Sequence, residues 1–225
     1  MAAVGGRSII RVALVAVPSN TAAGLFGIRD ALNSVGVAFE SFVTSEATSP
    51  RFEVSLVAAT SAPFVCASGV KVHPDHSIET MRETDIVVAS GMAVSATERC
   101  NTLDPRMVAW IAAQHAAGKQ VASSCTGAIL LAEAGLLKGK EATTHWAWRD
   151  FFRTAYPDVL LRLERNLCCA DREHRVVTAG GATAWQELAL YLIARHVGLR
   201  EAVRTAKFWL IPWQGDWQSP YVAMP

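Results

Sequence analysis

Short hydrophobic runs alternate with amphipathic stretches along most of the chain. The run at 12–17 has the length of a strand and no polar interruption, which is typical of a strand buried on both faces of a sheet. Similar runs predict further strands, at 52–58, 86–89, 121–123, 168–171 and 176–179. Hydrophobic residues at helical spacing predict helices between them, at 21–35, 104–118, 126–134, 146–155 and 185–196. This alternation favours an α/β fold, a doubly wound and mostly parallel sheet with helices on both faces.

Turn residues mark the ends of several elements. Ser68 and Gly69 separate two short hydrophobic pieces, which predicts a small hairpin over 64–72. Pro105 stands near the first position of its predicted helix, where its missing N–H would have no partner in any case. Gly118 follows the last residues of the same helix, as a glycine at a helix end commonly does. These signals support the element boundaries that the hydrophobic pattern predicts.

Length and charge bound the class of protein. The 225 residues suit one large α/β domain over 11–199, with a leader at 1–10 and a helix and linker at 200–225. Lys and Arg total 21 against 20 Asp and Glu, a formal net charge of +1. A protein that binds DNA neutralises phosphates with clustered positive charge. Because this chain has no such excess, we expect that it does not bind nucleic acid by itself.

Cysteine usage and hydropathy indicate the cellular compartment. The five cysteines form no CxxC pair, and the adjacent Cys168 and Cys169 suit neither a disulfide framework nor a zinc site. No window approaches the roughly 20 apolar residues that cross a bilayer, and Arg11 interrupts the apolar run near the N-terminus. The sequence therefore predicts a cytoplasmic protein with reduced thiols, no membrane partner, no bound metal and no cofactor.

One cysteine stands where a buried strand turns directly into a helix. The predicted strand at 121–123 leads to Cys125, and two small residues, Thr126 and Gly127, open the next helix. Such a turn lifts the side chain above the sheet edge and brings it near the unpaired N–H groups of the helix. These groups favour a thiolate, which predicts that Cys125 is more acidic than a free cysteine. From spacing alone, a cysteine that is merely packed in the core is the alternative.

The stretch from Ser123 to Trp146, SSCTGAILLAEAGLLKGKEATTHW, resembles the signature of the PfpI-type branch of the class I glutamine-amidotransferase-like superfamily. That branch includes peptidases, glyoxalase-like deglycases, isonitrile hydratases and the sensor halves of AraC-type transcription regulators. The resemblance extends over about 10–198 and implies a flavodoxin-like, glutamine-amidotransferase-like fold. It also implies that Cys125 is the nucleophile at the turn and that His145 is its partner base.

Two positions depart from the pattern of the catalytic members of this branch. Their first strand is followed by an acidic residue that shares a proton with the cysteine, but here the matching residue is Gly24, and no carboxylate occurs at 12–29. Where they carry two glycines for an oxyanion hole, this chain has Gly91 followed by Met92, whose side chain crowds the hole. Both departures weaken the case for turnover, and neither prevents ligand binding. We expect the small-molecule site to consist of seven residues: Gly24, Gly91, Met92, Cys125, Thr126, His145 and Trp146.

The C-terminal half resembles the regulator branch. Residues 178–193 are similar to the helix that such sensor domains carry before their linker, and 213–221 are similar to the connector that leads to their helix-turn-helix pair. The resemblance implies a ligand-sensing, homodimeric domain of an AraC-type regulator, which binds DNA only through a domain absent from this chain. A cysteine-dependent hydratase, glyoxalase or amidase is the alternative. Trp209, Trp213 and Trp217 recur at every fourth position, and on a helix they would form a stripe that docks on the domain or on a second subunit.

Overall fold

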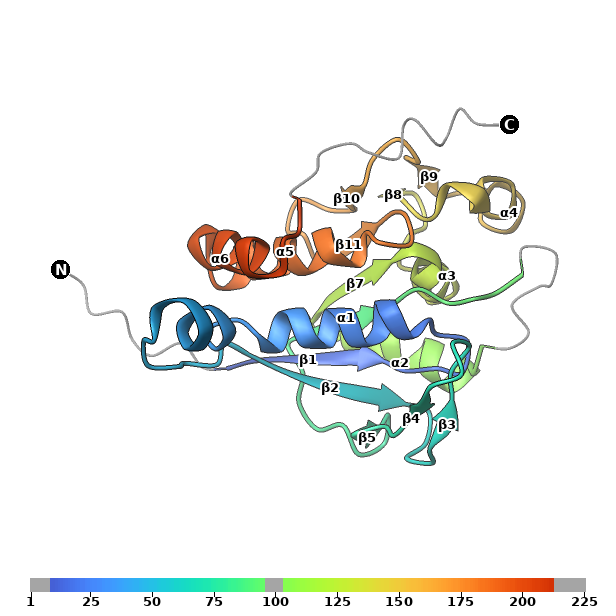
Figure 1. Cartoon of the computed structure of the whole chain (residues 1–225). Coiled ribbons are helices and arrows are strands. Elements are labelled where there is room, and N and C mark those ends of the chain that lie inside the picture. Colours follow the sequence, from blue (N-terminus) through green and yellow to red (C-terminus); the bar gives the residue numbers. More distant parts are fainter. Residues whose placement is uncertain (1–8, 96–102, 213–225) are drawn as a thin grey trace.

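A seven-stranded sheet runs through the part of the chain that the computed structural model describes, residues 9–95 and 103–212 (Figure 1). Its strands lie in the order β10-β11-β7-β6-β1-β2-β5. Neighbouring strands are parallel except for the edge pair of β10 and β11. The strands of this sheet are β1 (Ile10–Val15), β2 (Phe52–Ala58), β5 (His76–Ser77), β6 (Ile86–Ala89), β7 (Gln120–Ser124), β10 (Leu167–Cys169) and β11 (Val176–Ala179).

Helices connect and cover these strands. The α-helices of the described residues are α1 (Ala22–Asn33), α2 (Pro105–Ala116), α3 (Ala128–Glu133), α4 (Arg149–Ala155), α5 (Trp185–His196) and α6 (Leu199–Trp209). The shorter helical segments are the π-helix η1 (Glu40–Thr44) and the 3-10 turns η2 (Cys125–Gly127) and η3 (Trp146–Trp148). Two small pairings lie outside the main sheet: β3 (Phe64–Val65) with β4 (Lys71–Val72), and β8 (Glu141–Ala142) with β9 (Leu160–Leu161).

Alternate residues of the central strand β1 pack against different layers of helices. Val12 and Leu14 belong to the core beneath α1, α5 and α6, whereas Ala13 and Val15 belong to the core beneath α2, α3 and α4 (Figure 1). All four side chains are fully buried. Because successive side chains of a strand point to opposite faces, a strand buried in this way must have a helix layer on each side. The predicted doubly wound fold is therefore confirmed.

Several local predictions are also confirmed. Pro105 is the first residue of α2, and Asp104 caps this helix, since its side chain accepts a hydrogen bond of 2.9 Å from the backbone N–H of Arg106. The hairpin predicted over 64–72 is present as β3 and β4. Trp209 lies on its own domain: its indole N–H donates to the Ser34 hydroxyl at 3.0 Å. The stripe of tryptophans at every fourth position stays a prediction, because Trp213 and Trp217 lie outside the described residues.

Other elements differ from the predicted ones. The helices predicted at 126–134 and 146–155 begin as the 3-10 turns η2 and η3 and become α-helical only afterwards. The π-helix η1 has no amphipathic pattern that would predict it, since Phe42 and Val43 are exposed. Most of the leader, Cys100 and the connector at 213–221 lie outside the described residues.

Candidate functional site

Cys125 lies at the sharp turn that the sequence predicts between strand and helix. Strand β7 ends at Ser124, Cys125 has a left-handed backbone with φ of 55°, and η2 and α3 follow directly. A non-glycine residue rarely adopts this conformation, which occurs where the surrounding structure enforces it. Gly127 allows the close packing behind the turn, because a β-carbon at this position would lie 2.1 Å from the carbonyl oxygen of Ala89 on β6. The turn of Ser124, Cys125 and Thr126 is called the cysteine turn below.

Two glycines lie above the cysteine turn. A β-carbon placed on Gly91, which follows β6 in the chain, would lie 3.2 Å from Cβ and 3.7 Å from Sγ of Cys125. A β-carbon placed on Gly24, in the first turn of α1, would lie 3.6 Å from the backbone nitrogen of Gly91 and 3.3 Å from the Thr21 hydroxyl oxygen. Gly24 and Cys125 therefore both pack against Gly91. The structure thus brings together the cysteine and the position where the resemblance implies an acid.

The backbone of Met92 is tied to the cysteine turn. Its N–H donates to the Thr126 hydroxyl at 2.7 Å, and the same hydroxyl donates to the carbonyl oxygen of Met92 at 2.7 Å. Both residues are buried. The N–H that an oxyanion hole would use here is therefore already engaged within the protein. Sequence reasoning anticipated crowding by the Met92 side chain but not this hydrogen bond.

Asn20 joins the loop before α1 to the loop that follows β6 and carries Gly91. Its side-chain oxygen accepts from the backbone N–H of Val17 at 2.7 Å. Its amide nitrogen donates to the Ser90 hydroxyl at 3.2 Å and to the Gly91 carbonyl oxygen at 3.3 Å. Asn20 is only 1% exposed, so these bonds replace its contacts with water. In the sequence this asparagine is only part of a turn after the first strand, and nothing there reveals its role.

Thr21 and Thr144 are two further residues of the site that sequence reasoning missed. Thr21 precedes α1 as its N-cap residue, but its hydroxyl makes no capping bond, and it lies beside Gly24 instead. Thr144 is fully buried and donates its hydroxyl proton to the carbonyl oxygen of Cys125 at 2.9 Å. This bond fixes the segment before His145 to the cysteine turn. Hydroxyl side chains are too common in turns for the sequence alone to single these two out.

His145 follows Thr144, so its segment is held at the cysteine turn, but its imidazole shares no hydrogen bond with the Cys125 thiol among the described residues. Its Nδ1 accepts from the backbone N–H of Ala147 at 3.2 Å, and its ring lies 5.4 Å from the ring of Trp146. Burial lowers the pKa of His145, which favours the neutral imidazole. Within the part of the chain that the structure describes, His145 therefore does not stand as a base hydrogen-bonded to the thiol.

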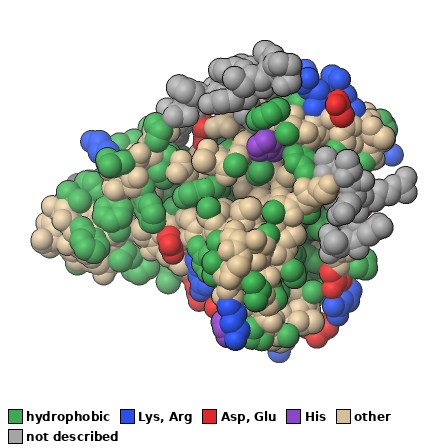
Figure 2. Space-filling view, turned by 45° about the vertical axis from the view of Figure 1, so that its right-hand side comes forward, with side chains coloured by type: hydrophobic (Ala, Val, Ile, Leu, Met, Phe, Trp, Pro, Cys, Tyr) green, Lys and Arg blue, Asp and Glu red, His purple; other side chains and the backbone are tan. Residues whose placement is uncertain are grey.

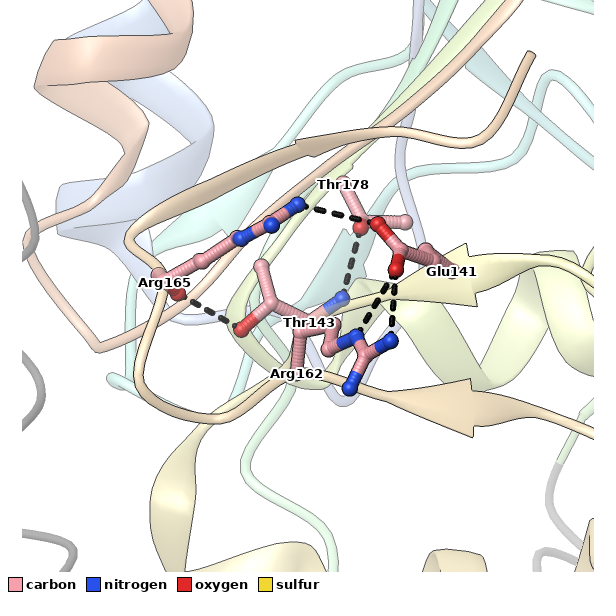
Figure 3. Close-up of polar contacts among 5 residues, drawn as sticks. All are labelled: Glu141, Thr143, Arg162, Arg165 and Thr178. Carbon is pink, nitrogen blue, oxygen red and sulfur yellow. Dashed lines mark hydrogen bonds and ion pairs between the residues drawn. The ribbon is translucent and has the colours of Figure 1, made fainter.

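A polar network holds the segment that leads to His145 (Figure 3). The backbone N–H of Thr143 donates to the Thr178 hydroxyl on β11 at 2.8 Å, and the Thr143 hydroxyl donates to the carbonyl oxygen of Arg165 at 2.9 Å. Glu141 accepts from the guanidinium groups of Arg162 at 2.8 Å and Arg165 at 2.9 Å (Figure 3). These bonds tie β8 to the edge of the main sheet and thereby position the histidine segment.

The acidity of Cys125 is opposite to the sequence-based prediction. Burial of the side chain raises the pKa of the Cys125 thiol, and hydrogen bonding from the backbone N–H of Thr126 offsets only part of this rise. The prediction of a thiol more acidic than a free cysteine is therefore wrong. The physical reason is that loss of water around the thiolate outweighs the N–H groups of a helical segment that begins as a single 3-10 turn.

Alkylation of Cys125 provides a direct check of this correction. A raised pKa leaves less thiolate at neutral pH, so iodoacetamide should label Cys125 more slowly than free cysteine at pH 7. The labelling rate should increase with pH, with a midpoint above the ordinary thiol pKa of about 8.5. Peptide mass spectrometry over a series of pH values measures both quantities. A midpoint below that of free cysteine would show that the helix end dominates after all.

The described residues give no sign of a metal centre or a membrane span, and one face of the molecule shows no broad basic patch. No group of three or more His, Cys, Asp or Glu residues in 9–95 and 103–212 is arranged to hold a metal ion. Within the same residues, no helix is long and apolar enough to cross a membrane. On the face in Figure 2, Lys and Arg side chains stand singly or in small groups, several of them beside Asp or Glu side chains. That face offers no continuous surface for phosphates.

Comparison with known proteins relates this chain to both regulators and an enzyme. It is 30% identical over 152 residues to the HTH-type transcriptional regulator CdhR of Pseudomonas aeruginosa, covering 68% of this chain and 43% of the regulator. It is 34% identical over 158 residues to an isonitrile hydratase of Pseudomonas putida, covering 69% of this chain and 64% of the hydratase. The chain thus spans less than half of the regulator and under two thirds of the hydratase.

Solved structures and a family model extend the comparison. The crystal structure of an AraC family transcriptional regulator from Pseudomonas putida superposes with a TM-score of 0.68 at 18% identity, covering 89% of this chain and 99% of that chain. At this identity the likeness shows a shared fold. The model of the DJ-1/PfpI family matches residues 16–195, which include the strands and helices that build the cysteine turn. The chain therefore belongs to the DJ-1/PfpI family.

Proposed function

We propose that this chain is the ligand-sensing and dimerisation domain of an AraC-type transcription regulator that acts in the cytoplasm. A small-molecule effector binds above the cysteine turn, in contact with Gly24, Gly91 and Cys125, and the His145–Trp146 segment forms the side of the site. DNA is bound through another domain of the regulator. The similarity to CdhR supports the regulator assignment, and the net charge of +1 supports a separate domain for DNA.

The observation that carries this proposal is the glycine at position 24. It is buried beside the Gly91 backbone, which itself lies over Cys125, and the resemblance implies a carboxylate at this position in the catalytic members. A glycine supplies no carboxylate that could take or return the proton of a reacting group. The engagement of the Met92 N–H by Thr126 removes a second catalytic element. The site therefore lacks both the acid and the free N–H that turnover would use, and neither loss prevents ligand binding.

The competing function is that of a cysteine-dependent hydratase. The 34% identity to an isonitrile hydratase favours it, as does the left-handed Cys125 at the turn. The raised pKa of the Cys125 thiol argues against it, because burial disfavours the nucleophilic thiolate. The neutral His145 shares no hydrogen bond with that thiol within the described residues, so a direct proton acceptor for it is not in place either.

Ligand-induced stabilisation tests the proposed site. A panel of small amines, amides and carboxylic acids is screened by thermal melting against the wild type and Gly91→Ala, whose added β-carbon would lie over the Cys125 side chain. A compound at 100 times its Kd should stabilise the wild type by about 2.7 kcal/mol, which is several degrees for a domain of this size. The shift should be lost in Gly91→Ala and kept in Thr154→Ala, an exposed control on α4. A compound that stabilises Gly91→Ala as strongly as the wild type binds elsewhere and contradicts the proposed site.

A further inference from the structure

Three reactive side chains meet at the opposite end of the sheet from the cysteine turn. Cys169 ends β10, His174 lies in the turn between β10 and β11, and Tyr191 lies on α5. The Cys169 sulfur lies 3.4 Å from Nδ1 of His174 and 3.6 Å from the Tyr191 oxygen, and His174 Nδ1 and the Tyr191 oxygen are 2.5 Å apart. All three side chains are half-buried. The group is called the Cys169 cluster below.

The hydrogen bonds of the Cys169 cluster form a path for a proton. The thiol of Cys169 donates to the Tyr191 oxygen, and the phenol O–H donates in turn to Nδ1 of His174. Movement of one proton along each bond leaves a thiolate, a neutral phenol and an imidazolium. Burial raises the pKa of Cys169, which Tyr191 and the charge of Arg195 offset in part, so the resting thiol needs such an acceptor to ionise.

The surrounding structure fixes His174 in this geometry. Its carbonyl oxygen accepts from the side-chain amide of Gln120 at 2.6 Å, and the Gln120 oxygen lies 2.7 Å from Nε2 of His196. His174 itself has a left-handed backbone, with φ of 58°. These contacts keep the imidazole beside the sulfur without any involvement of Cys125.

We propose that Cys169 is a second reactive site of this protein, which hydroperoxides oxidise to a sulfenic acid. The thiolate sulfur attacks one oxygen of the hydroperoxide, an S–O bond forms, and the O–O bond breaks. The sulfur loses two electrons, and the departing oxygen takes the proton that His174 received from the thiol. The balanced reaction converts the thiol and one hydroperoxide to the sulfenic acid and one alcohol, or water when the oxidant is hydrogen peroxide.

The proton path selects a hydroperoxide over other thiol reagents. A leaving alkoxide or hydroxide needs a proton, and the imidazolium of His174 supplies one through Tyr191 at the moment of cleavage. An alkyl halide has no such need. Cys168 offers an internal contrast: it points to the opposite face of β10, is only 2% exposed, and burial raises its pKa to about 11. Arg165 offsets part of this rise but accepts no proton, so one strand carries one thiol with a proton acceptor and one without.

Trapping of the sulfenic acid tests the proposal. The whole chain is treated with hydrogen peroxide in the presence of dimedone, and tandem mass spectrometry assigns the label to Cys168 or Cys169. Label should accumulate at Cys169 at least about tenfold faster than at Cys168. Tyr191→Phe keeps the ring and His174→Asn tolerates the left-handed backbone, and each should slow labelling of Cys169 about tenfold. Tyr156→Phe, which removes a phenol oxygen just after the end of α4, is the matched control and should leave the rate unchanged.

Two results would overturn the proposal. Equal labelling of Cys168 and Cys169 would show that the Cys169 cluster gives no assistance. Wild-type labelling of Cys169 in both Tyr191→Phe and His174→Asn would show that the contacts are only structural. Thermal melting of each variant separates an effect on the reaction from a loss of fold, and the two independent variants keep the test decisive if one of them unfolds. Neither result bears on ligand binding at Cys125.

Discussion

Replacing Gly127 by alanine should destabilise the fold by about 3 kcal/mol or prevent folding. The added β-carbon would lie 2.1 Å from the Ala89 carbonyl oxygen and 2.9 Å from that of Ser90. Both neighbours are backbone atoms of β6 and its following residue, which cannot rotate away as a side chain can. Relief of the clash requires α3 to move off the sheet, and the cysteine turn would move with it. Urea unfolding followed by circular dichroism measures the loss.

Gly24→Ala is the control for this substitution. Its β-carbon would meet no atom closer than 3.3 Å, and alanine suits the first turn of α1 better than glycine does. The free energy of unfolding of Gly24→Ala should therefore stay within about 1 kcal/mol of the wild-type value. If Gly127→Ala were as stable as Gly24→Ala, the close packing of the cysteine turn on β6 would be refuted.

Thr126→Val should lower the free energy of unfolding by about 2–6 kcal/mol. Valine keeps the shape of threonine but removes the hydroxyl that both accepts from and donates to the Met92 backbone. The N–H and the carbonyl group of Met92 would then be buried without partners, and each such group costs roughly 1–3 kcal/mol. Chemical denaturation of the purified variant provides the measurement.

Thr126→Ser isolates the role of the hydroxyl. Serine loses one methyl group and keeps both hydrogen bonds, so its cost should be near the value for one lost methyl group, about 1 kcal/mol. Equal losses for the valine and serine variants would mean that packing of the methyl group, rather than hydrogen bonding to Met92, makes Thr126 important. That result would also mean that the Met92 N–H is free to donate a hydrogen bond to a ligand.

The fold could be predicted from the sequence because its central strands are buried on both faces. The run at 12–17 and similar runs predict buried strands from local sequence alone. An uninterrupted hydrophobic stretch of that length between turn signals is typical of a strand buried on both faces. The two-residue strands β8 and β9 could not be predicted, because two residues carry no periodicity. The π-helix η1 could not be predicted either, because its hydrophobic side chains are exposed and form no buried face.

The candidate site could be predicted only in part. The order of strands brings Gly24, Gly91 and Cys125 together, because they follow β1, β6 and β7, which are neighbours in the sheet. The sign of the Cys125 pKa shift could not be predicted, since it depends on how completely the thiol is buried. The partners of buried polar groups, such as Asn20 and Thr126, depend on contacts between loops that no local pattern encodes.

Assay of isonitrile hydration by the wild type tests most directly whether the site binds without turnover. We predict no formation of the formamide product above the buffer rate, because Gly24 provides no acid and the Met92 N–H is engaged. Cys125→Ser, which nearly preserves the volume of the side chain, should then give the same background. Turnover of about 1 per second or faster by the wild type, abolished in Cys125→Ser, would contradict the account and assign the chain to the enzymes of its family.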